Sequence, residues 1–226
     1  MTQLASDRPP EAVEGPGAAR LAGTLGIAGL ISGLLLVIAY ELTLPRIERN
    51  RADALRRAVL EVVPGSTAMQ KLVWTGTALV VADGGESQDA PAIHAAYGAG
   101  GEFLGYAIPG EAAGFQDVIK LLYGFDPARR RIVGMRVLES KETPGLGDKI
   151  YKDPAFARNF EELAVEPAIV AVKTGTRRLP HEVDAITGAT ISSKAVVRIL
   201  NGSFAAWASR LPAPGSEPAL RTEGTR

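Results

Sequence analysis

The sequence predicts an α+β protein, with a single N-terminal transmembrane helix followed by an antiparallel-sheet domain with helices packed against it. Two observations lead to this prediction. An uncharged apolar run, long enough for a membrane-spanning helix, occupies residues 21–40. Short β-rich segments separated by glycine and proline turns then lead to a helical pattern over 190–207.

The composition limits the possible functions. The 226 residues include 25 lysines and arginines against 25 acidic residues, so neither a basic field for nucleic acid nor an acidic excess for disorder is present. The chain has no cysteine, which excludes disulfides, iron–sulfur clusters and thiolate zinc sites. His94 and His181 lack ligand-like spacing, so we expect no metal site. Any redox chemistry must therefore use an organic cofactor.

The N-terminal region is predicted to anchor the chain in a membrane. Residues 1–20 are rich in Pro, Gly, Ala and Glu without periodicity, which predicts a disordered tail. We interpret residues 21–40 as an uncleaved transmembrane helix, since the run is long for a signal peptide and no small-residue cleavage site follows it. A cleaved signal peptide or a buried core helix are the alternatives. Gly29 and Gly33 have the spacing that lets another membrane helix approach.

The charges beside this helix do not settle its orientation. Two arginines precede residues 21–40 and five follow within residues 46–57. The positive-inside rule would then leave the large domain in the cytoplasm. That rule is weak for long translocated domains, because it counts only the short flanks.

The remaining chain is predicted to form one domain over 65–210. A membrane-proximal helix over 45–64 precedes it and ends at Pro64. The tail 211–226 is predicted to be disordered. Within the domain we expect strands over 71–76, 78–85, two within 92–110, a hairpin over 117–140, a short helix over 153–160, a strand over 168–175 and a helix from Thr190 to Trp207.

The start of this last helix reads TGATISS, residues 187–193, and has two interpretations. A hydroxyl side chain at a helix start caps free backbone N–H groups. The same N–H groups and the helix dipole also form an anion site suited to phosphate, beside which Thr190 would present its hydroxyl. No G-x-x-x-x-G-K-[ST] sequence occurs here, so nucleotide hydrolysis is not indicated.

A second unusual stretch, ETPGLG, occupies residues 142–147. Pro144 restricts one backbone angle, and Gly145 and Gly147 permit positive φ. Taken alone, this stretch is compatible with an ordinary turn.

Together, ETPGLG and the later DAITGATISS resemble the FMN-binding domain family, which includes the G subunit of Rnf electron-transport complexes and the C subunit of sodium-translocating NADH:quinone oxidoreductase. In that family a flavin transferase esterifies the FMN phosphate to the last threonine of an [S/T]-G-A-T motif. The resemblance implies covalent FMN on Thr190. It further implies a cofactor-binding site at Glu142, Thr143, Pro144, Gly145, Leu146, Gly147, Asp184, Thr187, Gly188, Ala189 and Ser193.

The resemblance implies a covalently flavinylated electron carrier in a membrane-bound Rnf-type ion-translocating ferredoxin/NAD oxidoreductase complex, without catalytic acid–base residues of its own. Its partners would be the other membrane and redox subunits, a flavin transferase for maturation, and the membrane, with no nucleic acid. The chain would be a single-pass protein of the bacterial inner membrane with its domain in the periplasm. Rnf-type sequences often have histidine just before ETPGLG, where this chain has Ser140 and Lys141.

Three alternatives remain open from the sequence. The chain is also compatible with the C subunit of the sodium-translocating quinone reductase, although the GDKI continuation over 147–150 and the short chain favour the Rnf type. A flavin domain of another membrane electron-transfer or regulatory system is the second alternative. The third is a cofactor-free membrane-anchored scaffold, in which Thr190 is only a helix cap.

Overall fold

The structure, a computed structural model, describes residues 17–85, 87 and 90–221. The chain divides into two compact units, residues 1–52 and 53–226. Most of the N-terminal segment predicted to be disordered, residues 1–16, lies outside the described residues. Ala18–Arg20, which we included in that segment, are already helical.

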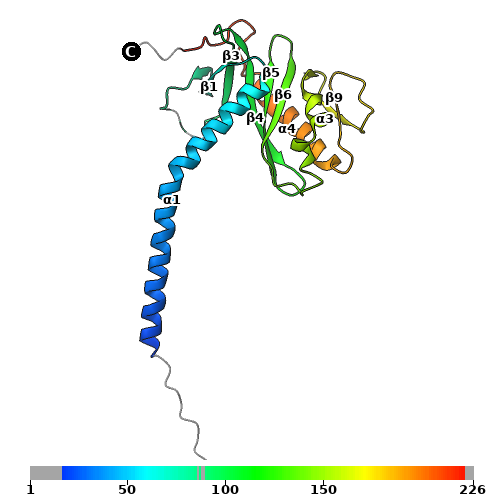
Figure 1. Ribbon diagram of the computed structural model, residues 1–226. Helices are drawn as coiled ribbons and strands as arrows, with labels where there is room; N and C mark the ends of the chain where they lie inside the picture. Colours follow the sequence, from blue (N-terminus) through cyan, green and yellow to red (C-terminus); the bar gives the residue numbers. More distant parts are fainter. Residues whose placement is uncertain (1–16, 86, 88–89, 222–226) are drawn as a thin grey trace, which may run out of the picture. The chain divides into compact units, whose positions relative to one another are not determined.

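One helix, α1 (Ala18–Val62), replaces the two helices that we predicted over 21–40 and 45–64 (Figure 1). This helix is 45 residues long and continues through Pro45. A proline inside a helix removes one backbone hydrogen bond. The Arg, Ala, Leu and Glu residues that follow Pro45 are strong helix formers, which accounts for the continuation.

The first part of α1 is long and apolar enough to cross a membrane. Its most apolar window of 18 residues has a mean hydropathy of 2.3, and none of that window is buried in the structure. The core helix of a soluble protein would be mostly buried. The exposure of this helix therefore argues against the buried-helix alternative.

The second unit contains a seven-stranded sheet in the order β2-β1-β3-β4-β5-β6-β7, with antiparallel pairing throughout. This arrangement confirms the predicted α+β fold with an antiparallel sheet. The strands are β1 (Ala68–Trp74), β2 (Leu79–Val81), β3 (Ala92–Tyr97), β4 (Phe103–Ala113), β5 (Val118–Asp126), β6 (Arg131–Glu139) and β7 (Leu163–Ala164).

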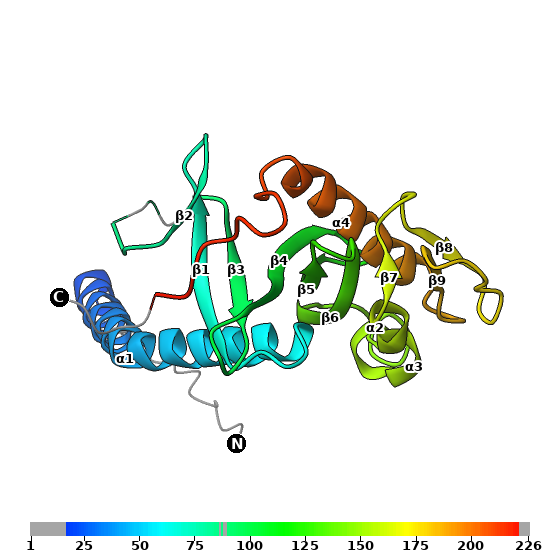
Figure 2. The same ribbon diagram turned by 90° about the horizontal axis from the view of Figure 1, so that it is seen from above.

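The sheet is covered on both faces. Figure 2 shows α4 (Thr190–Ala208) along one side of the sheet and the last turns of α1 along the other. Side chains alternate accordingly: Leu121 and Tyr123 of β5 belong to the larger core cluster beneath α4, and Leu122 packs with Val59 of α1. This two-sided burial gives α4 a rigid support.

A peripheral lobe begins after β6. Two short helices and one 3₁₀ turn lead into β7, and a parallel pair, β8 with β9, precedes α4. This parallel pair forms a separate two-stranded sheet beside the antiparallel sheet that we predicted. These elements are α2 (Lys149–Lys152), α3 (Pro154–Ala157), η1 (Arg158–Phe160), β8 (Val170–Val172) and β9 (Glu182–Asp184).

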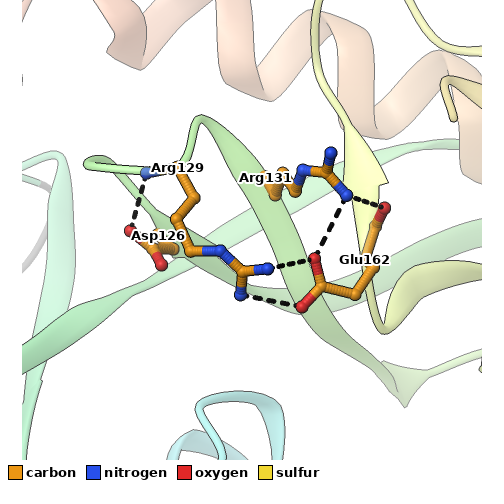
Figure 3. Close-up of polar contacts among 4 residues, drawn as sticks. All are labelled: Asp126, Arg129, Arg131 and Glu162. Atoms are coloured by element: carbon orange, nitrogen blue, oxygen red, sulfur yellow. Dashed lines mark hydrogen bonds and ion pairs between the residues drawn. The ribbon is translucent and has the colours of Figure 1, made fainter.

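Ion pairs connect this lobe to the β5–β6 hairpin (Figure 3). Both terminal nitrogens of Arg129 donate to the Glu162 carboxylate, at 2.8 and 2.7 Å. Arg131 donates to the same carboxylate at 3.2 Å, and Asp126 accepts from the Arg129 backbone N–H at 3.1 Å. Pairs this exposed contribute little stability, so their main effect is to fix the register of the turn against the segment before β7.

Of the C-terminal tail predicted to be disordered, residues 211–221 are ordered against the domain, and residues 222–226 lie outside the described residues. Residues 211–221 run beside β1 and β3, as Figure 2 shows. The Tyr97 hydroxyl donates to the Pro218 carbonyl oxygen at 2.6 Å, and the Arg221 backbone N–H donates to the Gln70 amide oxygen at 2.8 Å. Leu220 packs against the core. These contacts order a segment that has no regular secondary structure of its own.

Candidate functional site

The start of α4 carries no side-chain cap. Ala189 is the N-cap residue, and its methyl group cannot accept a hydrogen bond. Thr190 is the first helical residue, and its side chain is exposed. The Thr190 hydroxyl lies 3.5 Å from the Ile186 carbonyl oxygen, the outer limit of a hydrogen bond. The interpretation of Thr190 as the helix cap is therefore wrong.

Ser193 shapes the turn that leads into α4. The Ser193 hydroxyl accepts from the Ile186 backbone N–H at 3.1 Å and donates to the Ala189 carbonyl oxygen at 2.9 Å. Its side chain is fully buried. Gly188 has a φ of 83°, a conformation that favours glycine. Ser193 thus holds the backbone of the motif, whereas we had counted it as a cofactor contact.

Asp184 and Thr187, also predicted as cofactor contacts, bind a neighbouring loop. Asp184 accepts from the backbone N–H groups of Thr176 and Arg177, at 3.1 and 3.0 Å. The Thr187 hydroxyl lies 3.0 Å from the Thr174 hydroxyl. Both side chains therefore stabilise the loop that precedes β9 and its junction with the motif.

The ETPGLG stretch forms a turn that Asp148 closes. The Asp148 carboxylate accepts from the Gly145 backbone N–H at 2.8 Å and pairs with Lys152 at 2.6 Å. The hydrogen bond from Lys152 holds the pKa of the Asp148 carboxyl below its usual range. Gly145 has a φ of 79°. The sequence reasoning missed Asp148, although an aspartate just after a glycine-rich turn is a common turn-closing residue.

Glu142 connects three segments through one buried carboxylate. One oxygen accepts from the backbone N–H groups of Phe115 and Gln116, at 2.8 and 3.0 Å. The other oxygen accepts from the Ser192 hydroxyl in the first turns of α4. Burial raises the pKa of the Glu142 carboxyl, but the hydrogen bonds from Ser192, Gln116 and Phe115 outweigh it and hold the pKa below its usual range. Glu142 is therefore ionised at neutral pH.

The two motifs face one cavity of about 310 Å³. Seven of the twelve predicted site residues line it, whereas Pro144, Gly145, Asp184, Thr187 and Ser193 do not. Three lining residues were missed: Phe115, Ile191 and Ser192. Phe115 lies in the β4–β5 turn, outside both sequence motifs. Neither motif therefore indicates that this residue lines the cavity. The lining residues are Phe115, Glu142, Thr143, Leu146, Gly147 and residues 188–192.

The cavity has apolar walls beside a polar end. Phe115, Ile191 and Leu146 are 63%, 58% and 51% exposed, more than any other large hydrophobic side chain in the described part of residues 53–221. The N-terminus of α4 also lines the cavity, and its N–H groups favour an anion. A ligand with a flat apolar body and a phosphate fits this combination, and FMN is such a ligand.

Comparison with known proteins agrees with this geometry. Residues 114–204 match the FMN-binding domain family. The chain is 30% identical to the G subunit of the ion-translocating oxidoreductase complex of Aliivibrio fischeri, over 77% of this chain and 82% of that one. The G subunit of the complex of the same name from Methanosarcina acetivorans is 29% identical, over 80% of this chain and 89% of that one. A shorter match is to the G subunit of the Na⁺-translocating ferredoxin:NAD⁺ oxidoreductase complex of Acetobacterium woodii. It is 35% identical and covers 46% of this chain and 49% of that one.

Solved structures share the fold. The crystal structure of Shewanella oneidensis NqrC superposes with a TM-score of 0.57 at 18% identity, over 68% of this chain and 91% of that one. The crystal structure of the C subunit of the Na⁺-translocating NADH-quinone reductase of Parabacteroides distasonis superposes with a TM-score of 0.56 at 20% identity. The match covers 72% of this chain and 94% of that one.

Fold and site together define a membrane-associated protein with an FMN-binding domain. More particularly, the chain belongs to the family of G subunits of ion-translocating oxidoreductase complexes.

Proposed function

We propose that this chain is a covalently flavinylated electron carrier in a membrane-bound Rnf-type ion-translocating ferredoxin/NAD oxidoreductase complex, with FMN joined to Thr190 by a phosphoester. The observation that carries this proposal is the exposed Thr190 hydroxyl at an uncapped helix start, inside a cavity with apolar walls. The match to the FMN-binding domain family favours a flavin protein over the cofactor-free scaffold.

The start of α4 would hold the phosphate. Because Ala189 offers no side-chain acceptor, the N–H groups of the first turn are left to an acceptor from outside the helix. A phosphodiester on Thr190 keeps a negative charge, which the positive end of the helix dipole stabilises by about 0.3–1 kcal/mol. Gly188 and Ala189 keep bulky side chains away from that group.

The apolar walls of the cavity would hold the ring system. Phe115, Leu146 and Ile191 offer apolar surface for an isoalloxazine. When bound, FMN supplies the redox chemistry, for which the chain has no cysteine of its own. Glu142 is the one titratable side chain among the lining residues, and three donors already occupy its carboxylate. The residues therefore bind and orient the cofactor and are not arranged for acid–base catalysis.

Attachment would depend on a flavin transferase acting on a domain outside the cytoplasm, next to the other redox subunits of the complex. The presence of α1 and the names of the relatives support a membrane complex. The domain is proposed to face the periplasm, with α1 as its single membrane anchor.

Substitution of Thr190 tests the attachment. The full chain, co-expressed with a flavin transferase, is expected to gain the mass of one FMN phosphoester on the peptide that contains Thr190. Thr190→Ala is expected to remove that mass completely and to change the free energy of unfolding by less than about 0.5 kcal/mol, because the side chain is exposed and caps nothing.

Thr187→Ala is the matched comparison, since it removes the other hydroxyl of the motif. This variant is expected to keep FMN on Thr190. Covalent FMN retained by Thr190→Ala but lost from Thr187→Ala would assign the attachment to Thr187 instead. Intact mass and in-gel flavin fluorescence of the denatured chains measure both outcomes.

A further inference from the structure

We infer that the Phe115 ring forms a wall of the flavin site and that Glu142 is a positioning residue, which holds the β4–β5 turn and the start of α4 in place and does not contact the flavin through its carboxylate. This inference rests on the proposed function and extends it to a turn outside both sequence motifs.

Phe115 combines a restrained backbone with a free side chain. Its backbone N–H donates to Glu142 at 2.8 Å. Its ring is 63% exposed and lines the cavity together with Thr190. The neighbouring Gln116 is held twice, through its N–H to Glu142 at 3.0 Å and through its side-chain oxygen to the Thr143 hydroxyl at 3.0 Å. An exposed aromatic ring on a restrained backbone is suited to packing against a flat ligand.

The carboxylate of Glu142 is buried and already bound on both oxygens by groups of the protein. It is 5% exposed, and its two oxygens accept from two backbone N–H groups and from the Ser192 hydroxyl. The three donors belong to the β4–β5 turn and to α4, and Glu142 itself belongs to the ETPGLG turn. One side chain therefore connects the three segments that enclose the cavity.

Two glycines make room for this carboxylate. A Cβ atom on Gly114 would lie 2.4 Å from one Glu142 oxygen, and a Cβ on Gly147 would lie 2.6 Å from the other. The Gly147 Cβ would also lie 2.9 Å from the Ser192 hydroxyl oxygen. Such approaches are closer than van der Waals contact, so the backbone is arranged around the carboxylate on both sides.

Two substitutions at Glu142 distinguish the effect of its charge from the effect of its side-chain length. In Glu142→Gln the amide oxygen can accept from both turn N–H groups, and the amide nitrogen can donate to Ser192. Glu142→Asp keeps the charge but is one methylene too short to span the same groups. Positioning predicts that Gln preserves the site and Asp impairs it, whereas a direct charge effect on the flavin predicts the reverse.

The first readout needs no flavin. Hydrogen–deuterium exchange of the full chain in detergent, expressed without transferase, follows the peptide that contains residues 115–117. We expect exchange at the wild-type rate in Glu142→Gln and at least about tenfold faster exchange in Glu142→Asp and Glu142→Ala, since the turn N–H groups lose their acceptor. Wild-type exchange in Glu142→Ala would overturn the positioning role. Glu142→Asp serves if Glu142→Ala does not fold.

The second readout uses the flavinylated chain. Iodide quenching of flavin fluorescence reports how well the protein covers the ring. We expect the quenching constant to rise about threefold in Phe115→Ala and to stay unchanged in Val118→Ala, a control on the same hairpin that is 41% exposed and does not line the cavity. Equal quenching of Phe115→Ala and wild type would overturn the flavin wall.

The flavin midpoint potential completes the test. It is expected to stay at the wild-type value in Glu142→Gln, and a shift in Glu142→Gln with none in Glu142→Asp would show direct action of the charge and overturn the inference. Intact mass is measured first. A wild-type chain without FMN contradicts the proposed function and the flavin wall with it, whereas wild-type exchange in Glu142→Ala contradicts the positioning role alone.

Discussion

The polar residues around the cavity fall into two groups at the residue scale. The first group accepts hydrogen bonds from backbone N–H groups and consists of Ser193, Glu142 and Asp184. Thr190, in contrast, is exposed at the helix start. Most buried polar groups find a partner within the fold, whereas an exposed group can bind a ligand. This difference separates residues that build the site from the residue that we propose to carry the cofactor.

The role of Ser193 leads to a prediction on stability. Ser193→Ala removes the acceptor of the Ile186 N–H, which is left buried and unpaired. We expect the free energy of unfolding to fall by about 1–3 kcal/mol. Lys194→Ala, at the exposed next position of α4, should change it by less than about 0.5 kcal/mol. Urea unfolding of both variants in detergent measures the difference, and equal stabilities would contradict the role of Ser193.

The buried imidazole of His94 predicts sensitivity to acid. Its Nδ1 atom has no hydrogen-bond partner among the described residues. Burial, followed by the nearby Lys71, lowers the pKa of His94 from 6.5 to about 4. Between these two values the unfolded chain binds the proton and the folded chain does not. Stability should therefore fall as the pH drops from 6.5 towards 4, by about 3 kcal/mol in total from this group.

His94→Gln tests this origin of the pH dependence. Its unfolding free energy should decline less steeply than that of the wild type over the same pH range, because the titrating group is gone. Identical slopes in wild type and His94→Gln would assign the acid sensitivity to other groups.

At the scale of elements, the end of α1 packs against two glycines of the sheet. Gly124 of β5 and Gly134 of β6 are paired neighbours in the sheet. Cβ atoms on them would lie 1.9 and 2.6 Å from the Val62 carbonyl oxygen. Helix and sheet approach this closely only because both positions lack a side chain.

Gly124→Ala should therefore push the end of α1 away from the sheet and destabilise the domain by about 3 kcal/mol. Gly202→Ala is the matched control, since Gly202 lies inside α4 with no atom within 4 Å of an added Cβ. There the better helix propensity of alanine should stabilise by up to about 1 kcal/mol. Thermal unfolding followed by circular dichroism measures both, and opposite signs are expected.

At the scale of the whole molecule, the chain combines an apolar helix with a domain that we propose faces the periplasm. The absence of cysteine makes this orientation easy to measure, because a single introduced cysteine is the only thiol in the chain. Thr77, in the turn between β1 and β2, is exposed. Ser6 lies on the other side of the apolar segment in the sequence.

A membrane-impermeant maleimide should label Thr77→Cys in cells with a permeabilised outer membrane. Ser6→Cys should react only after the inner membrane is lysed. The opposite pattern would place the domain in the cytoplasm, as the arginine count beside the anchor suggests, and would contradict the proposed location.

Much of the fold could be predicted from local patterns, and seven of the ten cavity-lining residues were predicted from the resemblance of the two motifs. Strands β1 to β6 alternate or run apolar over short segments, and the helix from Thr190 has clear periodicity, so both were predictable, whereas the two-residue strand β7 was not predicted. Continuation of α1 through Pro45 and the packing of residues 211–221 were not, because tertiary contacts and flanking helix formers outweigh local signals there.

The sequence by itself determined the membrane helix, the α+β class and the two motifs, because these follow from hydropathy, periodicity and residue type within short windows. Only the tertiary structure decided which motif residues face the cavity and which form hydrogen bonds to the backbone of neighbouring segments. The tertiary structure also brought Phe115 to the cavity and engaged both oxygens of Glu142. These features depend on where side chains point and on which buried groups need partners, and both are set by packing between segments far apart in the chain.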